Sequence, residues 1–331
     1  MLACYIESYG GADVVVTGEQ PEPKPSEGQV VFRMHAASVN PIDYKIRSGS
    51  IKALLPYQMP LILGSDASGI VTEVGPGVGD YQVGDRVAAR LSKKRIGAFA
   101  EKVLAHTDQL AKVPDKVSFE EAAAVALAGL TAWQCLTEVL KVRSSERILI
   151  HAGSGGVGHL AIQLAKALGA HVTTTASNEN HDWLHQLGAD VCIDYKREDF
   201  TQACEYFDCV LDTQGGHTLL ASIGHTRLGG RVVSIGDLPT PEVATEFSKP
   251  WLLPVFWFLS RTPRAKARAR DVAYRFWFMR EDGEQLAMLL DKMASGELQV
   301  KIAQEFALNQ TPEALRLSES GKVKGKVVIR P

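Results

Sequence analysis

Four glycines within six residues give the clearest chemical signal in the chain. They follow an apolar run at 146–153 and open an amphipathic stretch at 157–169. The six residues, which fit the pattern G-x-G-x-x-G, are Gly153, Ser154, Gly155, Gly156, Val157 and Gly158. Glycine lets the backbone turn tightly, and the N–H groups and dipole at a helix start attract phosphate. Between a strand and a helix, the pattern predicts a dinucleotide site. The alternative is a turn that binds nothing.

The end of the next expected strand, 170–177, predicts which nucleotide binds. An NAD site usually has Asp or Glu there, about 20 residues after the glycines, to hold the ribose 2′-hydroxyl. Here the strand ends at Ser177 and Asn178, and Glu179 lies just beyond. We therefore expect these two residues to bind a 2′-phosphate and favour NADPH over NADH. Alternatively, they only cap the following helix.

Strands and helices alternate around this turn. We expect helices at 157–169, 178–188 and 217–229. We expect strands at 146–153, 170–177, 190–195, 207–213 and 230–236. The strands are continuous apolar runs, as in sheets covered on both faces. This alternation predicts an α/β fold with a doubly wound parallel sheet.

The regions on either side differ from this middle part. The first ~120 residues are rich in short strands broken by turn residues, for example at 30–39, 69–75 and 85–91. Ser118 and Glu121 form a capping box that predicts a long helix. The tail reads as a helix at 284–296, a strand, a helix starting near Thr311 and a last strand at its end.

Composition excludes several classes of protein. The 331 residues carry a net charge of −2, which gives no reason to expect nucleic-acid binding. Five scattered cysteines suit a reducing compartment rather than a disulfide framework. The N-terminus lacks the features of a secretory signal, and the most apolar stretch, 251–259, is too short to span a bilayer. We therefore expect a cytoplasmic protein with no transmembrane segment.

Six motifs in order along the chain resemble the medium-chain dehydrogenase/reductase superfamily. The similarity is strongest to its zinc-free branch of quinone oxidoreductases and enone or alkenal reductases. The motifs are NPIDYKIRSG (40–49), LGSDASGIVTEVG (63–75), VGDRV (83–87), AAAVALAGLTAW (122–133), HAGSGGVG (151–158) and SGKVKGKVVI (320–329). The resemblance implies a β-rich, GroES-like catalytic domain at 1–123 and 283–331, and a Rossmann domain at 124–282.

The zinc ligands of the metal-dependent relatives are missing at the matching positions. Their Gly-His-Glu motif reads Gly64-Ser65-Asp66 here, and the segment 37–40 has no Cys. Zinc requires Cys, His or carboxylate ligands in a tetrahedral array. His35 lies nearby, but we interpret it as a packed or surface residue. We therefore expect no metal, and an acceptor that needs little polarisation, such as a quinone or an α,β-unsaturated carbonyl.

The resemblance also assigns the reacting site. Residues 40–45 match the N-P-x-D-x-K motif of alkenal and enone reductases. By this match Lys45 stabilises the enolate that develops on the substrate, Asn40 and Asp43 orient the loop, and Asp43 could fix the ammonium of Lys45. Tyr44 and Tyr57 are further possible proton donors. The alternative for Lys45 is an exposed lysine on a turn.

Other positions match cofactor contacts in the family. Thr131 and Gly236 correspond to positions near the nicotinamide, and Asp212 begins a segment on the adenosine side. Tyr195 and Lys322 correspond to positions near the 2′-phosphate.

An aromatic and then basic segment at 247–280 has two interpretations. It forms a lid or rim for a lipophilic substrate near a membrane, or it packs on the sheet or on a partner and continues as a solvated helix. We favour the second interpretation. We also predict a homodimer, because relatives with a similar YRFWFM segment use that sheet edge to form dimers.

Overall we expect an NADPH-dependent reductase of a small-molecule quinone or conjugated carbonyl. The alternatives are a one-electron quinone reductase and a non-catalytic NADPH-binding or interaction protein.

Overall fold

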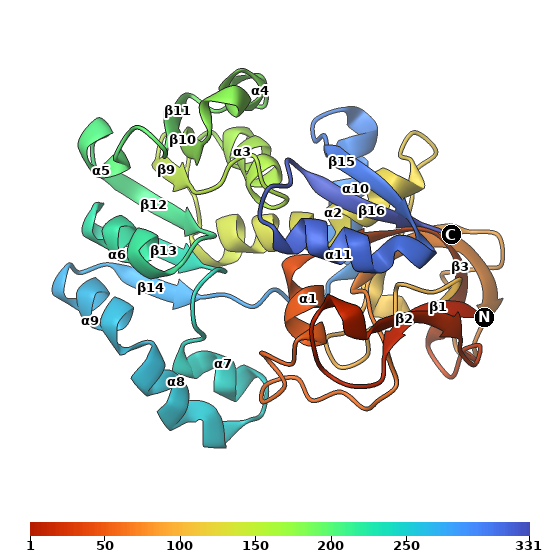
Figure 1. Ribbon diagram of the computed structural model, residues 1–331. Coiled ribbons are helices and arrows are strands. Elements are labelled where there is room, and N and C mark those ends of the chain that lie inside the picture. The colour runs from red at the N-terminus through yellow and green to blue at the C-terminus, as the bar shows by residue number, and fades with distance from the viewer. The chain divides into compact units, whose positions relative to one another are not determined.

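The computed structural model describes all residues from Met1 to Pro331. The chain forms two compact units (Figure 1). Unit 1 comprises Met1–Leu130 and Arg280–Pro331, and unit 2 comprises Thr131–Met279. Unit 2 is therefore an insertion in the sequence of unit 1.

Unit 1 is built mainly from β-strands. Its larger sheet runs β15 (Ile302–Ala307), β16 (Lys326–Arg330), β3 (Gln29–Val39), β5 (Asp66–Val74), β6 (Arg86–Arg90) and β8 (Leu110–Lys112), with β7 (Lys102–His106) also paired to β3. A second sheet has the order β2 (Val15–Glu19), β1 (Leu2–Ile6) and β4 (Leu61–Ile62). Its helices are α1 (Pro41–Arg47), α10 (Gly283–Ser295) and α11 (Thr311–Glu319), and α2 (Phe119–Gln134) begins in this unit. This is the expected β-rich, GroES-like domain.

The alternating side chains of these strands form one apolar core. Phe32 and Met34 on β3 are buried with Leu63, Phe99 and Leu315. Residues from both ends of the chain share this core, so β16 belongs to the same fold as β3. The two strands pair antiparallel, with Val327 opposite Val39.

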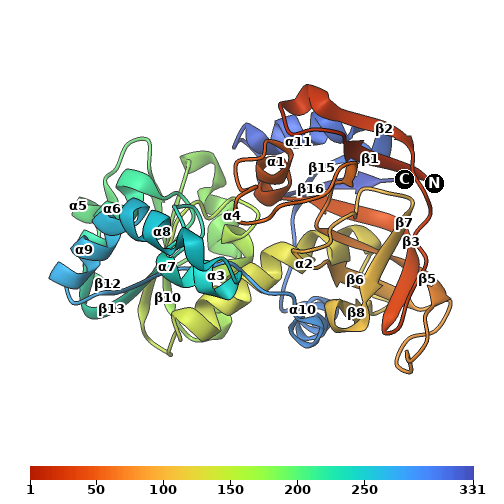
Figure 2. The same ribbon diagram turned by 90° about the horizontal axis from the view of Figure 1, so that it is seen from below.

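Unit 2 holds one six-stranded parallel sheet. Its order is β11 (Val191–Asp194), β10 (His171–Ala176), β9 (Arg147–Ile150), β12 (Phe207–Asp212), β13 (Thr226–Ser234) and β14 (Ala273–Phe276). The helices are α3 (Gly158–Ala167), α4 (His181–Gln186), α5 (Phe200–Ala203), α6 (Gly216–Gly224), α7 (Pro241–Glu246), α8 (Leu253–Leu259) and α9 (Arg261–Ala269). The chain starts in the middle of the sheet, builds outward on one side and then on the other. This is the doubly wound order of a Rossmann sheet. In Figure 2, which views the molecule from below, α6 and α9 lie beside the strands β12 and β13.

Several expected elements have different bounds. The helix expected at 217–229 ends at Gly224, and Thr226 already pairs with Phe207 as the start of β13. The helix expected at 178–188 is a 3-10 turn, Asn178–Asn180, followed by α4. The capping box before α2 is confirmed: the Glu121 carboxylate accepts from Ser118 N at 3.0 Å, and Glu121 N donates to the Ser118 hydroxyl at 3.2 Å.

By length and composition, one helical stretch could cross a membrane. It runs from Phe119 to Val139, and 72% of its most apolar window is buried within the protein. Buried core helices have the same composition, so this is weak evidence for a membrane span.

Candidate functional site

The glycine-rich turn connects the buried strand β9 to α3, and its glycines are required sterically. A Cβ on Gly158 would lie 2.2 Å from the Ala152 carbonyl oxygen, and one on Gly153 would lie 2.2 Å from Thr174 Oγ1. A larger residue at Gly158 would therefore have to move the backbone, and one at Gly153 would have to displace the Thr174 side chain. The glycine pattern in the sequence therefore reflects close packing of the turn against the strands and the helix.

The same turn leaves backbone donors unused. Gly155 N–H donates to the Ala152 carbonyl at 2.9 Å, but the amides of Gly156, Val157 and Gly158 donate to no protein acceptor. No side chain caps α3 at Val157. Three free N–H groups at the positive end of a helix are the arrangement that binds a phosphate or another anion.

The predicted nucleotide residues follow neighbouring strands at one edge of the sheet. Ala176 at the end of β10 is in register with Asp194 at the end of β11, so Ser177 and Tyr195 leave the sheet side by side. The Ser177 hydroxyl donates to Glu179 at 3.3 Å and accepts from the Asn180 amide at 2.9 Å. Asn178 and Tyr195 are exposed.

Sequence reasoning missed a cation at this edge. Lys196 directly follows Tyr195 and is exposed, and its Nζ lies 5.9 Å from the Tyr195 ring centre. The signal was available, because parallel strands bring their carboxyl ends to one edge and residue 196 follows the third strand. The expectation drawn from the sequence concerned the end of β10 alone.

Asp212 holds the loop after β12. Its buried carboxylate accepts from the N–H groups of Gln214 and Gly215 and from the Ser234 hydroxyl, the last at 2.6 Å. Burial raises the pKa of Asp212, while these hydrogen bonds oppose the rise. A Cβ on Gly236 would lie 2.4 Å from the Thr213 carbonyl oxygen, so two loops touch through their backbones there. The predicted contact of Asp212 and Gly236 with the cofactor stays a prediction.

The two remaining predicted cofactor residues come from other elements, and their roles stay predictions. Thr131 is buried on α2. Lys322 is exposed in the loop between α11 and β16, in unit 1, whereas the other predicted cofactor residues belong to unit 2.

Unit 1 contains a buried cluster of charged and amide groups, which we call the Asn40 network. The Asn40 amide donates to Asp66 Oδ1 at 3.0 Å and to the Ser38 carbonyl at 3.2 Å. The Lys326 ammonium donates to Asn40 Oδ1 and to the Val39 carbonyl, the latter at 3.1 Å. Asn40, Asp66 and Lys326 are each at most 3% exposed. The last strand of the chain thus holds the start of α1 through a buried ammonium.

Asp43 joins the same network from inside α1. Its carboxylate accepts from Asn40 N at 2.8 Å and from the Ser65 hydroxyl at 2.7 Å. The Arg90 guanidinium donates to the Ser65 and Leu91 carbonyls, the former at 3.2 Å. The prediction that Asp43 orients the loop therefore has a physical basis.

Burial governs the ionisation of this network. Burial raises the pKa of Asp43 to about 7, against the Ser65 hydrogen bond, and the nearby Asp66 adds to the rise. Burial raises the pKa of Asp66 to about 6, and Lys326 opposes this rise. Burial also lowers the pKa of Lys326, while the two carboxylates raise it. The charges compensate one another inside the protein, which is the condition for keeping them there.

One expectation for Lys45 is wrong. Asp43 does not fix its ammonium, because the Asp43 carboxylate is buried in the Asn40 network. Residues two apart on a helix point to different faces. Lys45 is partly buried, it makes no hydrogen bond or ion pair through its ammonium, and burial lowers its pKa. It is therefore a donor without a partner.

The two tyrosines differ in availability. Tyr44 is half-buried on α1, where burial raises its pKa. The Tyr57 hydroxyl donates to the Lys93 carbonyl at 2.6 Å, so its proton already has an acceptor. Burial also raises the pKa of Tyr57 well above its usual range.

The position of the metal motif in zinc-dependent relatives is filled by the Asn40 network. Ser65 donates its hydroxyl to Asp43 rather than offering a ring nitrogen. The His35 ring packs on Phe119 with centroids 4.5 Å apart, as expected of a packed residue. No group of three or more His, Cys, Asp or Glu side chains is arranged to hold a metal.

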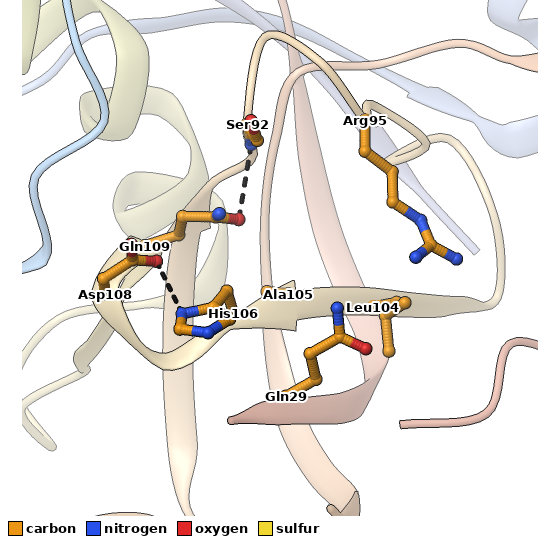
Figure 3. A pocket seen from close by; sticks show the side chains of 8 residues that line it. All are labelled: Gln29, Ser92, Arg95, Leu104, Ala105, His106, Asp108 and Gln109. Atoms are coloured by element: carbon orange, nitrogen blue, oxygen red, sulfur yellow. Dashed lines mark hydrogen bonds and ion pairs between the residues drawn. The ribbon is translucent and has the colours of Figure 1, made fainter. Parts of the chain in front are cut away.

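A separate hollow in unit 1 contains none of the predicted site residues (Figure 3). Within it His106 Nδ1 lies 3.0 Å from Asp108 Oδ1, and Ser92 N donates to Gln109 Oε1 at 3.3 Å. Its lining residues are Gln29, Ser92, Arg95, Leu104, Ala105, His106, Asp108 and Gln109. These two contacts join neighbouring lining residues and suggest no catalytic arrangement.

Comparison with known proteins identifies the family. Residues 26–115 match the alcohol dehydrogenase GroES-like domain, and residues 187–329 match the zinc-binding dehydrogenase family. The chloroplast envelope quinone oxidoreductase homolog of Arabidopsis thaliana is 31% identical over 348 residues, covering 100% of this chain and 98% of the relative. The chain belongs to the medium-chain dehydrogenase/reductase superfamily.

Solved structures in this superfamily place the chain in its quinone oxidoreductase branch. The quinone oxidoreductase from Coxiella burnetii has a TM-score of 0.89 and 35% identity, covering 100% of this chain and 99% of that one. The Escherichia coli quinone oxidoreductase complexed with NADPH has a TM-score of 0.84 and 27% identity, with 100% of both chains covered. This chain is therefore an oxidoreductase of the medium-chain dehydrogenase/reductase type.

Proposed function

We propose that this oxidoreductase is NADPH-dependent and independent of zinc, and that it transfers hydride to a quinone or an α,β-unsaturated carbonyl compound. The observation that carries the proposal is the set of three free amides at residues 156–158 on the carboxyl edge of a Rossmann sheet. The relatives named as quinone oxidoreductases, one of them bound to NADPH, support the same assignment.

The residues of unit 2 fit a dinucleotide phosphate. The amides of the glycine-rich turn would hold the pyrophosphate, and Ser177, Asn178 and Tyr195 would surround the 2′-phosphate. Lys196 supplies positive charge beside them. Glu179 is bound to Ser177 by a hydrogen bond of 3.3 Å, which is long and easily exchanged for a phosphate oxygen. When bound, NADPH supplies the hydride.

Lys45 is the proposed group for the substrate oxygen. Hydride addition to a conjugated carbon moves negative charge onto oxygen, and a donor already in place stabilises that charge. The Lys45 ammonium is partly desolvated and has no partner, so it can donate without breaking an existing bond. The Asn40 network fixes the helix that carries it. Tyr44 is the second candidate for the proton donor. Tyr57 is a weaker candidate, because its hydroxyl already donates to a carbonyl oxygen.

The same network supports the proposed independence from zinc. Where zinc-dependent relatives place a ligand, this chain has Ser65, whose hydroxyl is bonded to a buried carboxylate. Hydride transfer to a conjugated acceptor needs a hydrogen-bond donor rather than a Lewis acid. Activity should therefore survive EDTA treatment.

Turnover of a substrate panel tests this proposal. Purified, EDTA-treated protein is mixed with NADPH or NADH and a series of enals, enones and quinones. We expect rapid NADPH loss with at least one of them. Lys45→Met should lower kcat at least about 100-fold, the value typical of one lost oxyanion donor, with NADPH affinity unchanged. Lys52→Met, an exposed lysine without a partner, is the matched control.

Other results would redirect the assignment. Normal turnover in Lys45→Met would remove the role of Lys45. NADPH binding without turnover of any compound would favour a non-catalytic binding protein. Radical quinone products would favour one-electron reduction. Preference for NADH would contradict the 2′-phosphate site, and Lys196→Ala should shift kcat/KM toward NADH if that site is correct.

We also propose a homodimer and a cytoplasmic location. β14 is the last strand of its sheet and has a free edge for pairing with a second copy. All five cysteines are free thiols, which suits a reducing compartment. Size-exclusion chromatography with light scattering and cell fractionation test the two statements.

A further inference from the structure

A group of large apolar side chains on unit 2 is exposed to water. Trp251 is 60% exposed, Trp257 58% and Phe258 56%. We call the group the aromatic patch, and its members are Trp251, Leu253, Val255, Trp257, Phe258 and Leu259. They lie on the ten-residue apolar helical stretch Pro250–Leu259, which includes α8.

The exposure follows from how this stretch packs. Only Leu252, Phe256 and Ser260, spaced four residues apart, are buried. One narrow face therefore contacts unit 2, and the other faces are apolar although they point to solvent. A surface helix of a soluble domain normally has polar residues on those faces. A contiguous apolar surface marks a binding surface.

Positive charge adjoins the patch through α9. From Phe247 to Arg270 there is no acidic residue, and α9 with the residue after it carries five basic ones. They are Arg261, Arg264, Lys266, Arg268 and Arg270. The Arg261 guanidinium lies 4.0 Å from the centre of the Phe258 ring, and Arg264 lies 5.9 Å from that of Trp257. In both views α8 and α9 are neighbours (Figures 1 and 2).

We propose that the aromatic patch and α9 dock unit 2 on the surface of an anionic lipid bilayer. Trp and Phe side chains insert at the level of the lipid headgroups, and adjacent Arg and Lys side chains bind the anionic headgroups. Ten residues are too few to cross the hydrocarbon core, so the stretch lies in the plane of the interface. This inference does not rest on the proposed catalytic function.

Charge favours lipid over a second copy of the chain. A twofold contact places the same surface of both copies face to face. If the aromatic patch formed such a contact, α9 of one copy and its cations would lie close to α9 of the other copy. No acidic residue in the segment compensates them. An anionic bilayer complements both the apolar and the basic part.

Sedimentation with vesicles tests the proposal. The whole protein is mixed with vesicles of phosphatidylcholine alone, or of equal parts phosphatidylcholine and phosphatidylglycerol. We expect binding to the anionic vesicles, weaker at high salt, with a blue shift of tryptophan emission. Arg261→Glu/Arg264→Glu and Trp257→Ser/Phe258→Ser should each weaken binding at least about tenfold.

Matched variants keep the test specific. Lys24→Glu/Lys116→Glu makes the same change of charge in unit 1, and Leu228→Ser removes an exposed leucine from β13. Both should bind like the unmodified protein, and circular dichroism checks that every variant is folded. Absence of binding to anionic vesicles, or binding unaffected by Arg261→Glu/Arg264→Glu, would overturn the proposal. So would a change from dimer to monomer in Trp257→Ser/Phe258→Ser, because the patch would then be an interface between copies.

Discussion

Replacing Lys326 with Met tests whether the buried ammonium is essential to unit 1. Met has a similar length and no charge, so the change removes two hydrogen bonds and one positive charge without opening a large cavity. The Val39 carbonyl and Asn40 Oδ1 lose their donor. The Asp66 carboxylate loses the cation that opposes the burial-driven rise of its pKa.

The expected cost follows from these losses. Removing one partner of a buried ion pair typically costs about 3–5 kcal/mol, because the other charge is left uncompensated. The pKa of Asp66 is already about 6 with Lys326 present, so a small further rise would protonate it at neutral pH. That proton uptake limits the penalty, and we expect about 3 kcal/mol at pH 7. The loss should be smaller at pH 5, where Asp66 is protonated more easily.

The assay must observe unit 1 itself. All five tryptophans, at positions 133, 183, 251, 257 and 277, lie in unit 2, so their emission does not report the unfolding of unit 1. Urea unfolding followed by far-UV circular dichroism, with hydrogen exchange of the amides in β3 and β16, reports the right part of the molecule. Lys52→Met is the control and should change stability by less than about 0.5 kcal/mol.

A double variant separates charge from packing. In Lys326→Met/Asp66→Asn the Asn40 side-chain amide can flip, so that its oxygen accepts from the amide introduced at position 66. The side-chain oxygen retained at position 66 can still accept from Leu127 N, as Asp66 Oδ2 does now. We expect the second change to restore at least about 1.5 kcal/mol. If Asp66→Asn makes Lys326→Met worse or leaves it unchanged, our electrostatic account of the network is wrong.

Three further variants test other parts of the structure. As pH rises from about 4 to about 7, Asp43→Asn should become more stable relative to the unmodified protein, by up to about 4 kcal/mol. The reason is that Asp43 has a raised pKa in the folded protein, so over this range it ionises in the unfolded state first, which lowers the stability of the unmodified protein only. Gly158→Ala would place a methyl group 2.2 Å from the Ala152 carbonyl oxygen and should abolish NADPH binding in a fluorescence titration. Tyr57→Phe removes a hydrogen bond to the Lys93 carbonyl and should cost about 1 kcal/mol of stability while changing kcat less than about threefold.

Each has a control and a contrary outcome. Asp115→Asn, at an exposed position, should show no such pH trend, and a flat profile for Asp43→Asn would contradict the raised pKa. Gly79→Ala has open space around the new methyl group and should bind NADPH normally. A large loss of kcat in Tyr57→Phe with stability unchanged would identify Tyr57 as a catalytic donor.

The sequence predicted unit 2 well because its signals are local. The order and type of β9 to β13 follow from apolar runs and turns, and the glycine-rich turn is a contiguous motif. The start of β13 was misplaced because Gly224 ends α6 earlier than the apolar pattern suggests, and pairing with Phe207 then draws Thr226 into the sheet.

The Asn40 network was not predictable in the same way. Asn40 and Lys326 are 286 residues apart, and their contact depends on β16 pairing beside β3. A lysine in an apolar strand is the only local sign, and an exposed side chain explains it equally well. Lys196 is a different case, because the order of the strands predicts that their carboxyl ends meet at one edge, and Lys196 follows Tyr195 there.

The insertion of unit 2 within unit 1 has a consequence for synthesis on the ribosome. Unit 2 is one continuous stretch of chain, so its sheet can close as soon as it has emerged. The larger sheet of unit 1 cannot close in the same way, because β3 pairs with β16. Residues 1–130 are synthesised long before residues 280–331, which include β16. During that interval Asn40 and Asp66 lack their ammonium partner and an edge of β3 is open to other chains. The first part of the chain to be made is therefore the last to fold, and a nascent-chain chaperone would be needed most while unit 2 is being translated.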